Sequence, residues 1–217
     1  MTAPARPAGD DSLKDWLAPA RTALVILDMQ TDFASPEGAM GRAGADLSAV
    51  PAALAAAQRL ADAARAAGAP VVFVGLMTAP EDDSAAWAER LRRQGRDPAE
   101  DFALCRAGEL GAAFVGPIPL VGEHVTAKLR YSGFFRTDLD AQLQRLGVDT
   151  LVIAGLTTDC CVDCTARDAF HLDYHVFLAH DACAAYEADL HEAALKSLAL
   201  NCAILVSTEA VAAAWAT

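Results

Sequence analysis

Short apolar runs, rich in β-branched residues, alternate with longer segments of helical periodicity, and this alternation restricts the fold more than any other feature. The runs occupy residues 22–27, 71–76, 124–129, 150–154, 176–179 and 203–206. Each is typical of a strand that is buried on both faces. Strands that alternate with helices join into a parallel sheet, because a parallel neighbour is reached only through a crossover. The sequence therefore predicts an α/β fold with helices on both faces of a parallel sheet.

The segments between the runs supply the expected helices. Apolar residues recur at helical spacing from Val50 to Ala64, and Gly68 and Pro70 end that helix. Further helices are expected over about 85–93, 139–146, 161–172 and 189–200, with a last one closing the chain. Residues 80–122 are less regular, and a long insertion of this kind in a compact domain is often functional.

Length and composition indicate one ordinary domain. The chain has 217 residues, of which 54% are hydrophobic, so a full apolar core is available. No linker or internal repeat is visible. Residues 21–217 are expected to form the single domain, and residues 1–20 a disordered or extended lead-in.

Charge and cysteine usage limit the partners and the compartment. The formal net charge of −12 repels nucleic acid and anionic membranes, so neither is expected as a partner. No signal peptide and no apolar stretch long enough to span a bilayer are visible. The six cysteines are therefore expected to be reduced thiols in a cytoplasm.

Three reactive residue types fall at the ends of expected strands. Asp28 follows the first strand, Lys128 ends the strand that begins at His124, and Cys161 follows a tight turn after residues 150–154. In an open parallel sheet the ligand site lies beyond the carboxyl ends of the strands, so the three side chains could converge there.

A cysteine at a helix start suits nucleophilic chemistry. Free backbone N–H groups and the helix dipole lower a thiol pKa and can receive an oxyanion. A carboxylate could take the thiol proton, and a lysine could stabilise the thiolate. Each residue also has an ordinary structural alternative: Cys161 as a small buried side chain, Asp28 as a turn residue and Lys128 as a solvated one.

Three motifs together resemble the isochorismatase-like cysteine hydrolases. The nucleophile segment of that family is matched by residues 155–169, beginning Gly-Leu-Thr-Thr-Asp-Cys-Cys-Val; its first-strand motif by residues 25–33; and its lysine segment by residues 123–134. The motifs come in the family's order, and the resemblance covers roughly residues 22–206. Each motif alone is weak, but the combination is specific.

The resemblance implies a three-layer α/β/α fold around a six-stranded, mainly parallel sheet of Rossmann-like topology, assembled as a homodimer or homotetramer. It implies a catalytic triad of Asp28, Lys128 and Cys161, and a cis peptide between Leu156 and Thr157. The oxyanion hole would involve Thr157, Cys160 and Cys161, and the substrate contacts would be Gln30, Phe33 and Tyr131. The implied reaction is hydrolysis of a small amide through a thioester, without a cofactor.

Comparison of subgroups narrows the expected substrate. Nicotinamidases carry an Asp/His metal cluster after the second strand, whereas residues 76–84 here contain no histidine, so no metal is expected. The full triad argues against a vinyl-ether hydrolase of the isochorismatase type. The stretch from Arg130 to Phe135 looks most like ureidoacrylate and biuret amidohydrolases, which favours a small ureido or carbamoyl substrate.

Other functions explain fewer residues. Cys161 and Cys164 form a C-x-x-C pair at a helix start, which is also a thiol-redox signature, but redox chemistry leaves Asp28 and Lys128 unexplained. A metal site built from His171, His175, His180 and Cys183 fits no zinc spacing. A catalytically dead binding protein has no reason to retain all three triad residue types.

Overall fold

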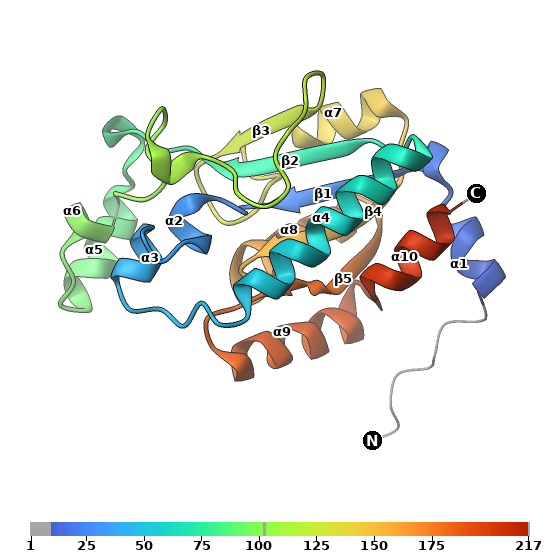
Figure 1. Ribbon diagram of the computed structural model, residues 1–217. Helices are drawn as coiled ribbons and strands as arrows, with labels where there is room; N and C mark the ends of the chain where they lie inside the picture. Colours follow the sequence, from blue (N-terminus) through green and yellow to red (C-terminus); the bar gives the residue numbers. More distant parts are fainter. Residues whose placement is uncertain (1–9, 102, 217) are drawn as a thin grey trace.

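Six parallel strands form one sheet in the order β3-β2-β1-β4-β5-β6 in the computed structural model, which describes residues 10–101 and 103–216 (Figure 1). The strands are β1 Thr22–Leu27, β2 Val71–Leu76, β3 His124–Lys128, β4 Thr150–Leu156, β5 His175–Ala184 and β6 Ile204–Val206. β1, β2 and β4 are buried along their whole length, as their apolar runs predict. The predicted fold class is confirmed, and the strand order reverses between β1 and β4.

One strand is longer than predicted. The apolar run of β5 ends where His180 and Asp181 interrupt it, and the sequence therefore predicted a strand end at residue 179. In the structure the register between β4 and β5 shifts, and pairing resumes with Gly155 opposite Cys183.

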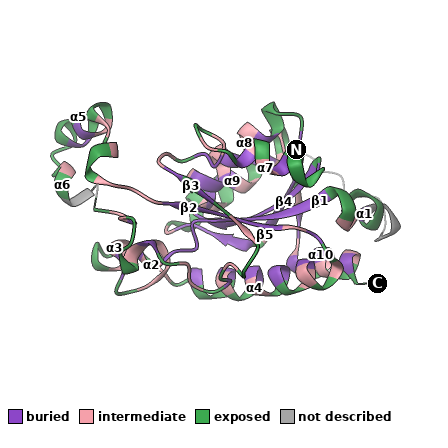
Figure 2. Cartoon of the chain, turned by 90° about the horizontal axis from the view of Figure 1, so that it is seen from above, coloured by how far each residue is buried: buried purple, intermediate pink, exposed green. Residues whose placement is uncertain are grey.

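The helices lie in two layers, one on each face of the sheet (Figure 2). On one face α4 and α10 pack over Leu24 and Ile26; on the other, α7, α8 and α9 pack over Val25 and Leu27. Side chains alternate between the faces along each strand, so one short apolar run serves both cores. The bounds are α1 Asp10–Trp16, α2 Thr31–Ala34, α3 Ala39–Arg42, α4 Val50–Ala67, α5 Ala85–Arg93, α6 Pro98–Asp101, α7 Leu139–Leu146, α8 Asp163–His171, α9 Ala188–Asn201 and α10 Thr208–Trp215.

The start of the chain corrects one expectation. Residues 10–16 form helix α1, although the sequence predicted a disordered or extended segment through residue 20. Leu13 and Leu17 join the core below α10, and the Trp215 indole Nε1 donates to the Leu17 carbonyl over 2.8 Å. These two leucines pack into the core, but the polar residues around them in the sequence do not indicate a buried helix. The expectation for residues 1–9 falls outside the described residues.

Part of the irregular insertion forms a small unit of its own, whereas Cys105 and Ala112 of the same insertion pack against Leu76. Its helices α5 and α6 lie beyond the carboxyl ends of the strands, at the end of the molecule opposite to α1 and α10 (Figures 1 and 2). Ala88 and Leu91 of α5 make a small apolar cluster with Trp87, distinct from the two main cores. The helix predicted over residues 85–93 is present with those bounds.

Candidate active site

Asp28, Lys128 and Cys161 meet at the carboxyl end of the sheet, next to the point where the strand order reverses. The Lys128 Nζ lies 2.7 Å from Asp28 Oδ2 and 3.4 Å from Cys161 Sγ. All three side chains are buried. A buried lysine in contact with both a carboxylate and a thiol is the arrangement that the strand-end pattern predicted.

The backbone of β1 and β2 fixes Asp28. Its N–H donates to the Val74 carbonyl, and its Oδ1 accepts from the Leu76 N–H at 3.0 Å. The chain turns at Asp28 with a φ of +50°, a conformation that non-glycine residues rarely adopt. Oδ2 accepts no further hydrogen bond from the described residues, so this oxygen keeps a lone pair for a proton.

Lys128 is the last residue of β3, opposite Leu76 of β2. Its Nζ also donates to the Arg130 carbonyl at 3.0 Å, which orients the ammonium group. Burial alone would lower the Lys128 pKa, but the charge of Asp28 and hydrogen bonds with Asp28 and Cys161 outweigh burial and raise it. Lys128 therefore stays protonated at neutral pH and supplies a fixed positive charge.

The turn after β4 presents Cys161. A cis peptide joins Leu156 and Thr157, as the family resemblance implied. The sequence predicted an α-helix from Cys161; instead a π-helical turn, Thr158–Val162, carries the cysteine, and the α-helix begins at Asp163. Gly155 brings this turn close to β1, because a Cβ on Gly155 would lie 2.3 Å from the Leu27 carbonyl oxygen.

The ionisation of Cys161 differs from the sequence expectation. A helix start was expected to lower the thiol pKa, but in the structure the Cys161 pKa is raised by a hydrogen bond with Cys160, by burial and by the charge of Asp28. Lys128 opposes this shift only in part. The resting group is therefore a thiol at neutral pH, and it needs a base before it can act as a nucleophile.

The expected oxyanion hole is only partly available. The Cys160 N–H donates to the Thr157 carbonyl at 3.1 Å, and the Val162 N–H donates to the same oxygen at 3.2 Å. Thr157 therefore contributes its carbonyl to the turn, and an oxyanion would have to compete for the Cys160 N–H. This competition arises because the tight turn that carries Cys161 is itself held by the hydrogen bonds to the Thr157 carbonyl.

A cavity of about 210 Å³ opens in front of the sulfur. It is lined by Phe33, Met40, Leu76, Trp87, Arg90, Leu91, Arg96, Leu104, Lys128, Arg130, Tyr131, Leu156, Thr157, Cys160, Cys161 and Tyr186. The structure thus brings two of the three expected substrate residues, Phe33 and Tyr131, to the cavity.

Gln30 corrects the third expectation, because it does not line the cavity. Its side chain is fully buried, and its Nε2 donates to the Leu76 and Ala112 carbonyls at 2.9 and 2.8 Å. Its Oε1 accepts from the Leu76 N–H at 2.9 Å. With its amide committed to the backbone, Gln30 supports the strand end that also holds Asp28.

Several cavity residues were not singled out from the sequence. Tyr186 follows β5, and its hydroxyl donates to the Phe33 carbonyl at 2.9 Å. Trp87, Arg90 and Leu91 come from α5, whose place over the site cannot be read from local periodicity. The only sequence signal was the length and irregularity of the insertion.

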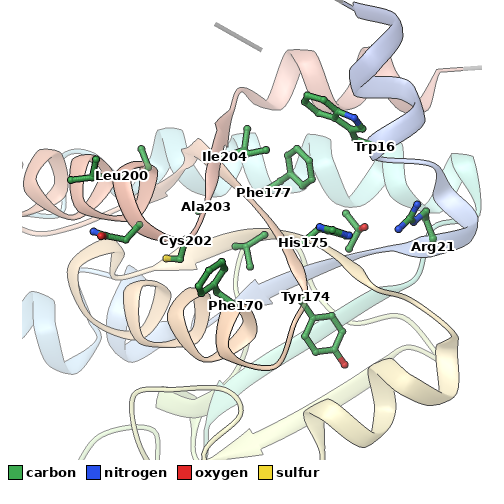
Figure 3. Close-up of a pocket in the computed structure, with 14 residues that line it drawn as sticks. Trp16, Arg21, Phe170, Tyr174, His175, Phe177, Leu200, Cys202, Ala203 and Ile204 are labelled. Carbon is green, nitrogen blue, oxygen red and sulfur yellow. The ribbon is translucent and has the colours of Figure 1, made fainter. Parts of the chain in front are cut away.

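A larger hollow, of about 510 Å³, lies at the other end of the sheet (Figure 3). The first residues of β4, β5 and β6, namely Thr150, His175 and Ile204, line it together with Trp16 and Phe170. It lies at the amino ends of the strands and contains no buried ion pair. The smaller cavity is therefore the candidate active site.

The described residues show no alternative centre. Across residues 10–101 and 103–216, no group of three or more His, Cys, Asp or Glu side chains is arranged to hold a metal ion. All six cysteines, including Cys161 and Cys164, are free thiols. Of the helices in these same ranges, none combines the length and apolarity that crossing a membrane requires.

Comparison with known proteins agrees with the fold and the motifs. The family model described as "Isochorismatase domain" matches residues 22–210. The ureidoacrylate amidohydrolase RutB of Methylobacterium radiotolerans is 38% identical over 192 residues, covering 84% of this chain and 74% of that protein. The chain therefore belongs to the isochorismatase family of hydrolases.

Solved structures show the same architecture. A cysteine hydrolase from Pseudomonas syringae pv. phaseolicola superposes with a TM-score of 0.80 at 25% identity, covering 99% of this chain and 98% of that one. An N-carbamoylsarcosine amidase from Thermoplasma acidophilum superposes with a TM-score of 0.68 at 27% identity, covering 87% and 97% respectively.

Proposed function

We propose that the protein is a cysteine-dependent amidohydrolase that cleaves a carbon–nitrogen bond of a small amide, ureido or carbamoyl compound through a thioester. The observation that carries this proposal is the buried contact of Lys128 with both Asp28, at 2.7 Å, and Cys161, at 3.4 Å. A buried ion pair costs desolvation energy and contributes little net stability, so a chemical role is a better reason for its presence.

The first step uses Asp28 as the base. Because the Cys161 pKa is raised, the thiol keeps its proton at neutral pH until a base removes it. The free lone pair of Asp28 Oδ2 takes the thiol proton, and the positive charge of Lys128 stabilises the thiolate that forms. The same lysine thus contacts both the base, at 2.7 Å, and the nucleophile, at 3.4 Å.

In the next step the thiolate attacks the substrate carbonyl carbon and the carbonyl oxygen becomes an oxyanion. The Cys161 N–H, with the Cys160 N–H if it leaves the Thr157 carbonyl, stabilises that oxyanion. When the tetrahedral intermediate collapses, the carbon–nitrogen bond breaks and the leaving nitrogen takes the proton from Asp28. Water then attacks the thioester, returns a proton to the thiol and releases the acid.

The named activities of two relatives favour a carbamoyl or ureido substrate. One is a ureidoacrylate amidohydrolase and the other an N-carbamoylsarcosine amidase. A cavity of about 210 Å³ is too small for a peptide chain and suits a compact metabolite. We further expect the enzyme to act in the cytoplasm without a cofactor, as a homodimer or homotetramer, which sedimentation of the purified protein would test.

An ammonia-release screen tests the activity, with ureido acids, carbamoyl amino acids, biuret and nicotinamide as substrates. Mass spectrometry of the quenched enzyme should detect an acyl adduct on the peptide that contains Cys161. A vinyl-ether hydrolase would consume isochorismate without such an adduct, and a thiol-redox protein would instead reduce a protein disulfide. Ammonia release that persists after Cys161 is alkylated would contradict the proposal.

A further inference from the structure

We propose that the outer end of the cavity is a carboxylate-binding site formed by the guanidinium groups of Arg90 and Arg130. The substrate would then be an anionic ureido or carbamoyl acid, with its carboxylate remote from the bond that is cleaved, and not a neutral urea such as biuret. This inference rests on the proposed amidohydrolase function and deepens it.

The charges that line the cavity are all positive. Arg90, Arg96 and Arg130 contribute guanidinium groups, and no Asp or Glu occurs among the described residues that line the cavity. This is unusual in a chain whose formal net charge is −12. At the inner end Lys128 pairs with Asp28, so the positive charge proposed for ligand binding is that of Arg90 and Arg130.

Arg90 differs from its neighbours on α5. Arg92 and Arg93 of the same helix both pair with Glu89, at 3.7 and 2.8 Å. Arg90 forms no ion pair with any carboxylate of the described residues, and it lies on the helix face that reaches the cavity with Trp87 and Leu91. Residues three and four positions apart share a helix face, which explains this division of roles.

Arg130 lines the same cavity from the loop after β3. Its Nη1 donates to the Leu129 carbonyl, and it too forms no ion pair with a described carboxylate. The remaining guanidinium N–H groups are available to a ligand. Its main-chain carbonyl holds Lys128, so the same residue links the outer end of the cavity to the reacting groups.

The two arginines are connected through a ring contact. Trp87 packs edge-on against Tyr131, with ring centroids 5.8 Å apart, and this ties α5 to the loop after β3. Arg90 lies one helical turn beyond Trp87, and Arg130 lies next to Tyr131. Arginine binds carboxylates through paired N–H donors, so guanidinium groups from α5 and from the loop after β3 can hold and orient one carboxylate.

Substrate pairs that differ only in charge test the site. We would measure ammonia release from 3-ureidopropionate and from its methyl ester. Arg90→Gln should lower kcat/KM for the acid by about 10- to 100-fold, mostly through KM, because a hydrogen bond to a charged group is lost. Release from the ester should change by less than about threefold, since a neutral group gains little from the arginine charge. Arg93→Gln removes the same charge from the exposed face of α5 and should change neither substrate.

Binding without turnover separates this inference from the proposed function. Calorimetry with Cys161→Ala should show 3-ureidopropionate binding that weakens about tenfold or more when Arg90→Gln or Arg130→Gln is added. Binding should also weaken as salt is raised. If the acid and ester are processed equally and neither arginine variant alters binding, the carboxylate site is wrong, whereas ammonia release could still occur. If no substrate releases ammonia but binding depends on the arginines, the site stands and the proposed reaction fails.

Discussion

The carboxyl and amino ends of the sheet differ in the side chains that line their cavities. At the carboxyl end, the buried Lys128 lines a cavity of about 210 Å³ and contacts both a carboxylate and a thiol. At the amino end, a hollow of about 510 Å³ is lined mainly by apolar and aromatic side chains (Figure 3). The larger hollow is therefore not the more reactive one. Buried charges with defined partners locate the chemistry better than volume does.

The largest expected effect concerns the nucleophile at the carboxyl end. Cys161→Ala should lower kcat by at least about four orders of magnitude, because triad residues act as a unit. Cys160→Ala should keep activity within about tenfold, since the Lys128 ammonium group donates to the sulfur of Cys161. Steady-state ammonia release, with circular dichroism to verify folding, measures both. Equal losses in the two variants would mean that the wrong cysteine has been assigned.

Substitution of Asp28 or of Lys128 should lower kcat in both cases, but the two substitutions should shift the Cys161 pKa in opposite directions. Asp28→Asn and Lys128→Met should each lower kcat by about three orders of magnitude or more. The Asp28 charge raises the Cys161 pKa and the Lys128 charge lowers it. Alkylation of Cys161 at neutral pH should therefore become faster in Asp28→Asn and slower in Lys128→Met. Shifts of the same sign in both variants would contradict the proposed division of roles.

A smaller effect is expected from the support beneath the nucleophile turn. The buried Thr158 hydroxyl and His191 Nδ1 lie 2.8 Å apart, which connects the turn to α9. His191→Leu should lower kcat by about tenfold with little change in KM, whereas His191→Gln, which can keep the hydrogen bond, should restore most of the loss.

His191 should also make the stability of the fold depend on pH. Burial, and then the charge of His180, lower the His191 pKa below its ordinary value of 6.5, while Glu192 and Asp159 oppose the shift. The unfolded chain therefore binds more protons, and this contribution is lost as the pH falls below about 6.5. The melting temperature of the wild type should fall more steeply with acid than that of His191→Gln. Identical slopes would show that His191 does not titrate in this way.

A substitution at the amino end of the sheet should lower the stability of the fold and leave the enzymatic activity unchanged. Tyr174 lines the larger hollow, and its hydroxyl donates to Asp140 at 2.8 Å. Tyr174→Phe should lower the free energy of unfolding by about 1 kcal/mol and leave kcat/KM unchanged. Urea denaturation and ammonia release measure the two quantities. A change in kcat/KM beyond about threefold would mean that the two ends of the sheet are coupled.

Local pattern was enough for the framework of the fold and the three central residues. The strands are short apolar runs with clear ends, and parallel topology alone brings Asp28 and Cys161 to one edge. The motif resemblance added the cis peptide at Leu156–Thr157. Helix α1 was missed because Leu13 and Leu17 pack against residues distant in sequence, such as Trp215, which lies about 200 residues away.

The ionisation and the cavity walls depend on contacts that sequence does not display. The sign of the Cys161 pKa shift results from burial, Cys160 and Asp28, which outweigh the helix start that the sequence suggested. Gln30 was misassigned because its position beside Asp28 resembles that of a ligand contact, whereas the backbone uses its whole amide. The place of Arg90 in the cavity depends on how α5 packs against the site, and the local sequence pattern does not show this packing.

Gly155 has an evolutionary consequence. Strand packing at this position, where even a methyl group would overlap the Leu27 carbonyl, sets how close the base and nucleophile can come. The reacting groups thus belong to the rigid sheet, while α5 and its arginine belong to an insertion with its own small apolar cluster. Mutations in the insertion can change which molecule is selected without moving the atoms that react. Evolution can therefore change the substrate through substitutions in the insertion, whereas any side chain at Gly155 would overlap the Leu27 backbone and displace the turn that carries Cys161.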